Sequence, residues 1–295
     1  MSNVSEVTGR GAAWTEEPGC GDEGRWHPTA PRRASGITVA LHAEWTKLRT
    51  VSGPAWLLLG VAVLTIAVGA AATGATHCPQ GMTCPVDTTR LSLSGVMAGQ
   101  AVVAILAVLM FSNEYSSGMI RVTLAAMPSR VSVLAAKAIL LAGIVLVAAA
   151  VAVFGSVVVG HLILPGHGFT AARGFHTVWL SYGPTLRAAC GSVLYLGLIA
   201  LMSLGVAVLV RDSAVSIGVS LALLYLFPIV LAFIGNEQWQ RRLERWTPTS
   251  AGLNIQDTIG LKGLAITPWA GLGVLAIWAG ASLVLGGLAL RLRDA

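Results

Sequence analysis

Six apolar runs, each long enough to cross a lipid bilayer as a helix, constrain this chain more than any other feature of its sequence. A helix rises about 1.5 Å per residue, so about 20 apolar residues span a hydrocarbon core of roughly 30 Å. Of 295 residues, 55% are hydrophobic and 11% are charged, against about 25% charged in soluble domains. We therefore predict an all-α, polytopic integral membrane protein. The six predicted transmembrane helices are residues 54–72, 91–111, 131–160, 188–210, 213–234 and 268–290.

The positive charges between the runs predict the orientation, because Lys and Arg are enriched in cytoplasmic loops. They precede the first run, lie in residues 113–130 between the second and third, and occur at Arg211, Arg291 and Arg293. The opposite loops carry fewer, except residues 235–267, where acidic residues offset them. We expect a multi-pass protein of the plasma membrane with both termini cytoplasmic. Since the basic residues are dispersed, they do not indicate nucleic-acid binding.

The chain before the first run divides into two segments. Residues 1–35 are rich in Gly, Pro and charged residues, so they cannot bury enough apolar surface to offset the entropy of ordering. We predict that they form a disordered cytoplasmic tail and not a signal peptide, because no apolar region follows the early charges. Residues 54–295 form the predicted six-helix transmembrane domain.

Residues 36–53 have the spacing of an amphipathic helix lying in the cytoplasmic membrane interface. Apolar residues recur at intervals of four, four and three. This stripe consists of Ile37, Leu41, Trp45 and Leu48. An extension of the first transmembrane helix is the alternative. The residues assigned to the interfacial helix are Glu44, Trp45, Lys47 and Arg49.

The sequence lacks the motifs of several common enzyme and nucleotide-binding sites. It contains no G-x-x-x-x-G-K-[ST], no H-E-x-x-H and no G-x-S-x-G, so it binds no ATP through a P-loop and has no zinc-protease or nucleophile-elbow motif. The one formal charge inside a predicted span is Lys137, which we expect to reach the interface by snorkelling. Gln100 is expected to form a helix–helix hydrogen bond. The lack of charge in the spans argues against a proton-coupled transporter and an intramembrane enzyme.

The outer loops contain the remaining candidate sites. Cys78 and Cys84 lie in the first outer loop, where an oxidising compartment permits a disulfide. Free thiols remain an alternative, as does a Cu(I) site formed with two neighbouring soft ligands, His77 and Met82. His161, His167 and His176 have no partners at helical spacing and are interpreted as interfacial histidines.

Pro228 lies within the fifth predicted span, where its missing N–H removes one helical hydrogen bond and predicts a kink. The sequence leaves open whether that kink is a hinge or static.

Residues 113–130 form the one dense polar insert between two apolar runs. Within it, Glu114 suits a basic groove on a soluble partner, and Tyr115 supplies a rigid amphipathic contact. Gly118 permits a tight turn, and Arg121 adds a second charge. We therefore expect this insert to contact a partner in the cytoplasm. The alternative is an ordinary polar cytoplasmic loop in which Glu114 and Arg121 pair with each other.

Four local strings support a resemblance to the permease subunits of ABC-2 type ATP-binding cassette exporters. They are A-E-W-T-K-L-R-T at 43–50, N-E-Y-S-S-G-M-I-R-V-T-L at 113–124, V-R-D-S-A at 210–214 and T-P-T-S-A-G at 247–252. The resemblance implies that a separate ATPase subunit binds ATP and Mg²⁺, that this chain binds no cofactor, and that a second permease copy completes the exporter. It implies that the insert contains the coupling helix that docks on the ATPase, and that the segment before the last span forms short helices.

The expected activity is outward movement of a hydrophobic or amphipathic substrate, without covalent chemistry by this chain. The alternative is a membrane sensor, immunity protein or anchor that binds a partner without transport. The sequence selects neither a particular cargo nor a homodimer over a heterodimer.

Overall fold

The computed structural model describes residue 46 and residues 52–79, 84–116, 130–176, 178–233 and 235–292. They belong to one unit, Ala34–Ala295. Their regular secondary structure is helical, with no strand among them, which confirms the all-α prediction for this part of the chain. The predicted tail 1–35 and nearly all of the predicted interfacial helix 36–53 lie outside the described residues, so both stay predictions.

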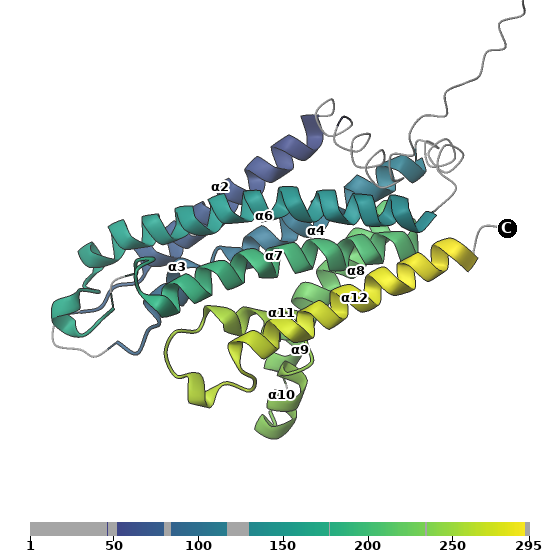
Figure 1. Cartoon of the computed structure of the whole chain (residues 1–295). Helices are drawn as coiled ribbons and strands as arrows, with labels where there is room; N and C mark the ends of the chain where they lie inside the picture. The colour runs from purple at the N-terminus through teal and green to yellow at the C-terminus, as the bar shows by residue number, and fades with distance from the viewer. Residues whose placement is uncertain are drawn as a thin grey trace, which may run out of the picture. The chain divides into compact units, whose positions relative to one another are not determined.

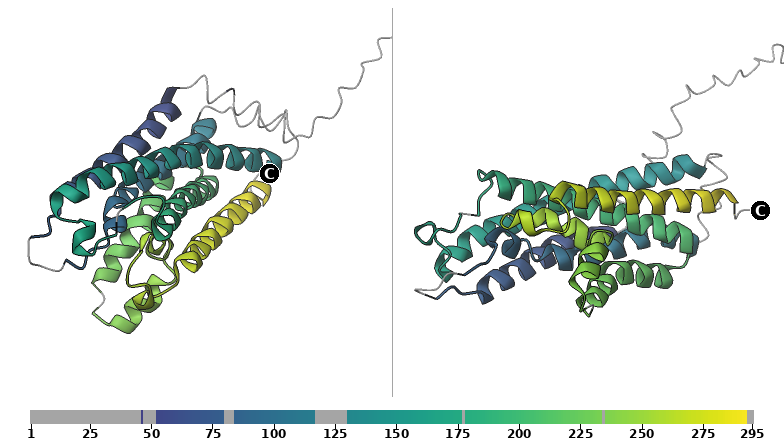
Figure 2. Two further views of the ribbon diagram at one scale, coloured as in Figure 1. Left: turned by 60° about the vertical axis from the view of Figure 1, so that its left-hand side comes forward. Right: turned by 90° about the horizontal axis from the view of Figure 1, so that it is seen from below.

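Five helical segments in the described ranges are long and apolar enough to cross a membrane. The long helices run alongside one another (Figures 1 and 2). These segments are α2 (Ser52–Ala75), α6 (Arg130–Ile163), α7 (Gly183–Val210), α12 (Pro268–Leu292), and a composite of α8 (Ser213–Leu221), a π-helical turn (Ala222–Leu226) and α9 (Phe227–Ala232). Five of the six predicted spans therefore correspond to helices of membrane-spanning length.

The second predicted span, residues 91–111, differs from the structure. A short helix, α3 (Thr88–Ser92), and a turn precede α4 (Val96–Ser116), whose apolar part, Val96–Ser112, is shorter than the other spans. The turn coincides with a close approach of two backbones. A Cβ atom on Gly95 would lie 1.8 Å from the carbonyl oxygen of Thr65 in α2, so only glycine allows this contact.

Helix α7 forms the centre of the bundle and packs against α4, α6 and α12. In the apolar stretch of α7 that would cross the membrane, 67% of the residues are buried within the protein, against 17–28% in the other four spans. Small residues allow this packing. A Cβ atom on Gly205 would lie 2.5 Å from the backbone carbon of Ser282 in α12, so these two helices meet through their backbones.

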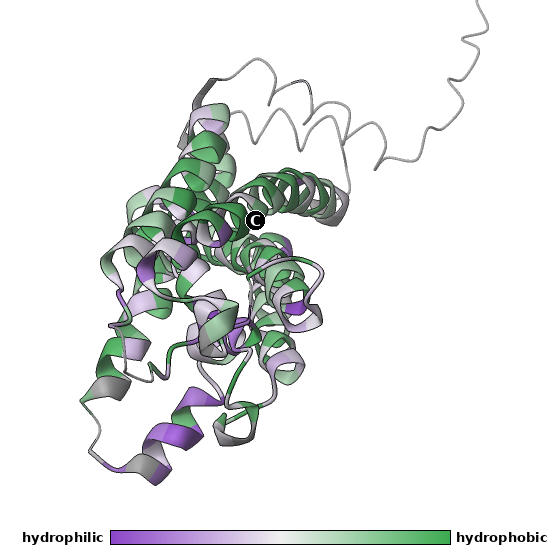
Figure 3. Cartoon of the chain, turned by 90° about the vertical axis from the view of Figure 1, so that its left-hand side faces the viewer, coloured by the Kyte–Doolittle hydropathy of each residue, from purple (hydrophilic) through white to green (hydrophobic). Residues whose placement is uncertain are grey.

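The outer faces of the long helices expose large apolar side chains. Val147 and Val151 on α6 are 68% and 59% exposed, and Ile277 on α12 is 70% exposed. Figure 3 shows hydrophobic colour over most of the long helices, whereas hydrophilic residues gather on the short helix α10 (Glu237–Glu244). Apolar faces of this extent are unusual in soluble monomers and suit contact with lipid.

The loops after α2, α6 and α9 gather at one end of the bundle, here called the loop end. It contains residues 76–95, 164–182 and 235–267 in their described parts. Besides α3 and α10, its short helices are Leu164–His167, Ala171–Arg173, α11 (Pro248–Leu253), Asn254–Gln256 and Leu261–Gly263. Short helices between the fifth and sixth spans were predicted and are confirmed. The opposite end is called the insert end, because α4 terminates there and α6 begins there.

Candidate functional site

The insert between α4 and α6 is described only at its edges. Helix α4 continues beyond its predicted end to Ser116, so the backbone of Glu114 and Tyr115 belongs to its last turn. Gly118 and Arg121 lie outside the described residues. The same holds for the four residues assigned to the interfacial helix, namely Glu44, Trp45, Lys47 and Arg49. Their predicted contacts with a partner and with lipid stay predictions.

Lys137 does not snorkel to the surface as predicted. It is 1% exposed, and its Nζ lies 3.5 Å from the carbonyl oxygen of Met110 in α4. The side chain is covered because it lies on the face of α6 that meets the end of α4, and not on the lipid-facing side. A buried cation is costly unless polar groups surround it, and the Met110 carbonyl is one such group.

The turn between α7 and α8 explains the string V-R-D-S-A. Arg211 adopts the left-handed conformation, with a φ of 64°, and its N–H donates to the Ala207 carbonyl over 2.9 Å. The next residue, Asp212, caps α8 by accepting a hydrogen bond from the Val215 N–H at 2.8 Å. The Arg211 guanidinium donates to the Ala289 carbonyl in α12 at 3.3 Å. Three helices are therefore tied together at the insert end.

Pro228 is the second residue of α9, which begins where the π-helical turn Ala222–Leu226 ends. Since proline has no N–H, regular helical hydrogen bonding cannot continue through it, and a π-helical turn is a common accommodation of such a break. The hydroxyl of Tyr225, inside that turn, donates to the Met97 carbonyl of α4 over 2.5 Å. The interruption of the fifth span is thus present in the structure, whereas its use as a hinge stays a prediction.

In the first loop of the loop end, Cys78 and Cys84 are joined by a disulfide, with their Cα atoms 6.1 Å apart. A disulfide sulfur is not a thiolate ligand, so the bonded pair excludes the Cu(I) arrangement considered for this loop. The bond closes the segment that leads from α2 to α3.

A capped ionic network joins α3 to the loop before α12. The Asp87 carboxylate accepts hydrogen bonds from the N–H groups of Thr89 and Arg90, at 3.1 and 3.2 Å, and so caps α3. It also accepts from the N–H and hydroxyl of Thr258, at 2.5 and 2.8 Å. Arg90 in turn lies 2.6 Å from the Asp257 carboxylate. The Asp87 carboxylate therefore holds α3 and the Thr258 segment together by hydrogen bonds, although Asp87 and Thr258 are 171 residues apart in sequence.

Asp257 is the most covered charged group of this network. Its side chain is 6% exposed, and that of Arg90 is 56% exposed. Burial raises the pKa of Asp257 above its ordinary value, and the positive charge of Arg90 opposes that rise. Arg187, in the first turns of α7, donates to the Asp257 carbonyl at 2.5 Å. The loop end is thereby linked to the central helix.

One polar contact lies deep in the bundle. The Tyr195 hydroxyl of α7 donates to the Gln100 side-chain carbonyl of α4, and both residues are fully buried. This confirms the prediction that Gln100 forms a helix–helix hydrogen bond. The hydrogen bond joins two neutral side chains and fixes the register of α4 against α7.

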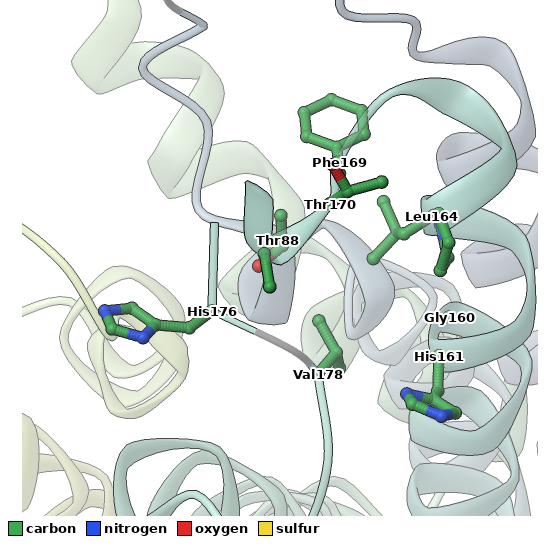
Figure 4. Close-up of a pocket in the computed structure, with 10 residues that line it drawn as sticks. Thr88, Gly160, His161, Leu164, Phe169, Thr170, His176 and Val178 are labelled. Atoms are coloured by element: carbon green, nitrogen blue, oxygen red, sulfur yellow. The ribbon is translucent and has the colours of Figure 1, made fainter. Parts of the chain in front are cut away.

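A small cavity of about 220 Å³ lies between the end of α6 and the segment that follows it (Figure 4). Its lining is mostly apolar, with His161 and His176 at its margins. The two imidazoles do not point toward each other in Figure 4. Instead, His161 packs on Trp179 with ring centroids 4.8 Å apart, and His176 stacks on Tyr182 at 4.6 Å.

Sequence reasoning missed most contacts of the loop end because they join distant segments. The third histidine of this region, His167, meets His77, which is 90 residues away, and no spacing rule connects such a pair. Asp87 is different, since an Asp followed by T-T-R is a helix N-cap signal that could have been recognised.

Residues 40–236 match the model of a family described as ABC-2 family transporter protein. No curated protein matches the chain. The matched residues include the whole insert, the disulfide loop and the first five predicted spans.

Proposed function

Because the chain belongs to the ABC-2 family of transporter proteins, we propose that it is the membrane-spanning permease of an ATP-binding cassette exporter. In this proposal, the chain moves a hydrophobic or amphipathic substrate outward, and a separate ATPase subunit supplies the energy. The observation that carries the proposal is the family match over residues 40–236, which covers two thirds of the chain. The long apolar helices are consistent with it, and the absence of a P-loop motif gives the chain a need for that partner.

The ATPase docks, in this proposal, on the insert that begins in the last turn of α4. Glu114 and Tyr115 enter the insert on a helix, and α6 resumes at Arg130, so a movement of the insert would act directly on two long helices. Lys137 is buried where those helices meet. A displacement of the insert produced by ATP binding would therefore reach the bundle through the helices at its two ends.

The insert end faces the cytoplasm and the loop end faces outward in this account. The distribution of Lys and Arg supports that orientation. The Cys78–Cys84 disulfide at the loop end also supports it, because disulfides persist in oxidising compartments outside the cytoplasm. Both termini are then cytoplasmic, and the protein resides in the plasma membrane.

A second permease copy completes the proposed exporter, with the substrate path between the two copies. Apart from Lys137, the formal charges on the described long helices lie near the helix ends, at Glu114, Arg130, Arg187 and Arg291. The wall of that path therefore suits apolar or amphipathic cargo. Transport follows from differential binding, since ATP stabilises one arrangement of the two copies and hydrolysis returns the other. The π-helical turn and Pro228 make the fifth span the candidate hinge.

Co-purification with the ATPase tests the docking surface. The chain is expressed together with a candidate ATP-binding cassette subunit and isolated from membranes, and the ratio of the two subunits is measured. We expect Glu114→Ala and Arg121→Ala each to lower that ratio. Arg291→Ala is the matched control, because it removes a charge from an exposed residue at the insert end of α12 but outside the insert. Unchanged recovery of the ATPase in both insert variants would contradict the proposal.

A further inference from the structure

Two histidines from segments far apart in the sequence converge at the loop end. The Nδ1 atoms of His77 and His167 lie 2.7 Å apart, and their ring centroids are 4.2 Å apart. His77 follows the end of α2, and His167 ends the short helix Leu164–His167 that continues α6. A nitrogen of each ring therefore faces the same point from a different segment.

The surrounding backbone holds the two rings in this position. The neighbour of His77 is Cys78, which is fixed by its disulfide to Cys84. The Cys78 N–H also donates to the His167 carbonyl at 3.0 Å. Beyond His167, Gly168 takes a left-handed conformation with a φ of 91° and turns the chain back. The convergence is thus built by covalent and backbone constraints and does not depend on ring contact alone.

We propose that His77 and His167 form a binding site for a borderline divalent transition metal ion such as Zn²⁺ or Cu²⁺. Neutral imidazole nitrogens are preferred ligands for these ions. The Nδ1 lone pairs of the two rings would occupy two adjacent coordination positions on one ion. Small movements of the rings would widen the separation of the two nitrogens to fit that ion. The hydrogen bond between the rings then describes the metal-free state, in which one Nδ1 carries a proton and the other accepts it.

The surroundings of the pair provide access and leave room for water. The rings border an open depression of about 440 Å³, whose lining also includes Pro165, Gly166 and Thr170. In the part of the chain that the structure describes, no group of three or more His, Cys, Asp or Glu side chains is placed to hold a metal. Among the described residues, the site therefore supplies two protein ligands, and the open depression gives solvent access to the remaining coordination positions.

A bound ion would join the end of α2 to the end of α6. These segments are otherwise connected at this point by the Cys78 backbone hydrogen bond, so the ion would act as a second clamp at the loop end. Because binding to the folded state stabilises it by mass action, the ion would raise the thermal stability of the protein by an amount that grows with the logarithm of its free concentration above Kd.

The experiment measures Zn²⁺ binding by calorimetry on the full chain in lipid nanodiscs, purified through a tag that contains no histidine. Loss of an outer-shell partner already costs a metal site roughly 10- to 100-fold in affinity, so we expect His77→Gln and His167→Gln each to weaken binding by about 100-fold or more. His161→Gln and His176→Gln are matched controls. His161 lies in the last turn of α6 and His176 in the loop end, and both pack on aromatic rings and not on the His77–His167 pair. We expect these controls to bind Zn²⁺ like the wild type.

A spectroscopic readout distinguishes a metal site from a hydrogen-bonded pair whose loss perturbs the fold. Electron paramagnetic resonance of bound Cu²⁺ should show coupling to two imidazole nitrogens in the wild type and should lose it in either variant. Size-exclusion profiles of the variants should match the wild type, since His77 is exposed. The proposal is overturned if the wild type binds no Zn²⁺, if His77→Gln and His167→Gln bind it unchanged, or if the two controls abolish binding.

Discussion

Gly271 in α12 provides a sharp test of how the loop end is packed. A Cβ atom at this position would lie 1.9 Å from the carbonyl oxygen of Ala251 in α11 and 2.8 Å from its carbonyl carbon. The first distance is about 1.5 Å short of the 3.4 Å at which ordinary contact begins. Because both atoms belong to the backbone, no side-chain rotation relieves the overlap. Gly271→Ala must therefore separate α11 from α12.

The expected loss of stability combines two opposing effects. Overpacking of a close-packed core typically costs about 1–3 kcal/mol, and the upper part of that range applies where backbone has to move. Alanine also favours a helix over glycine by up to about 1 kcal/mol. The net loss is therefore about 2 kcal/mol. For a chain of this size, that corresponds to a decrease in Tm of roughly 5 °C.

Gly273, two residues along the same helix, is the matched control. A Cβ atom there meets nothing within 4 Å, so Gly273→Ala retains the helical gain without the overlap. Both variants are compared with the wild type by differential scanning fluorimetry in the same detergent at one scan rate, because membrane proteins unfold irreversibly in many cases. Equal Tm values for Gly271→Ala and Gly273→Ala would refute the packing described for α11 and α12.

Three further perturbations address the loop end. Asp87→Ala removes the cap of α3 and the acceptor for Thr258, so it should lower the free energy of unfolding by about 2–3 kcal/mol. Asp212→Ala removes only the cap of α8 and should lower it by about 1 kcal/mol. Thermal unfolding of both variants checks that order. Because the pKa of Asp257 is raised, the folded protein binds a proton at this residue more readily than the unfolded chain does. Asp257 therefore stabilises the folded state below its ordinary pKa of 3.8, and this stabilisation is lost as the pH rises through the raised pKa. The stability difference between wild type and Asp257→Asn should therefore shift in favour of the wild type between neutral pH and pH 4, and a pH-independent difference would disprove this. The double variant Cys78→Ser, Cys84→Ser removes a disulfide between residues with a sequence separation of 6, and it should lower the free energy of unfolding by about 2 kcal/mol. Reaction of unreduced wild-type protein with a thiol reagent at Cys78 would contradict the disulfide.

The transmembrane helices could be predicted from the sequence because the bilayer imposes a local requirement. Each span needs its own run of apolar residues and satisfies its own backbone, so the run itself is sufficient information. The second span is the exception. The predicted start of this helix differs from the start of α4 because the turn around Gly95 depends on contact with Thr65 in α2, and no local sequence pattern indicates that contact.

The polar contacts of the candidate site were less predictable for a related reason. Gln100 was correctly assigned to a helix–helix hydrogen bond, because a lone amide in an apolar span has few alternatives. Lys137 was expected to reach the surface, but its direction depends on which face of α6 meets α4. The pairs Arg90–Asp257 and His77–His167 join segments separated by 167 and 90 residues, so only the assembled fold brings them together.

The central claim is that this permease has no ATPase activity of its own and receives energy through the insert. The direct measurement is ATP hydrolysis in proteoliposomes that contain the chain alone, its cassette partner alone, or the complex. We expect no hydrolysis by the chain alone. The partner's rate of ATP hydrolysis should change on assembly with the wild-type chain but not with Glu114→Ala or Arg121→Ala. Hydrolysis by the isolated chain, or a partner rate that responds equally to wild type and both variants, would contradict it.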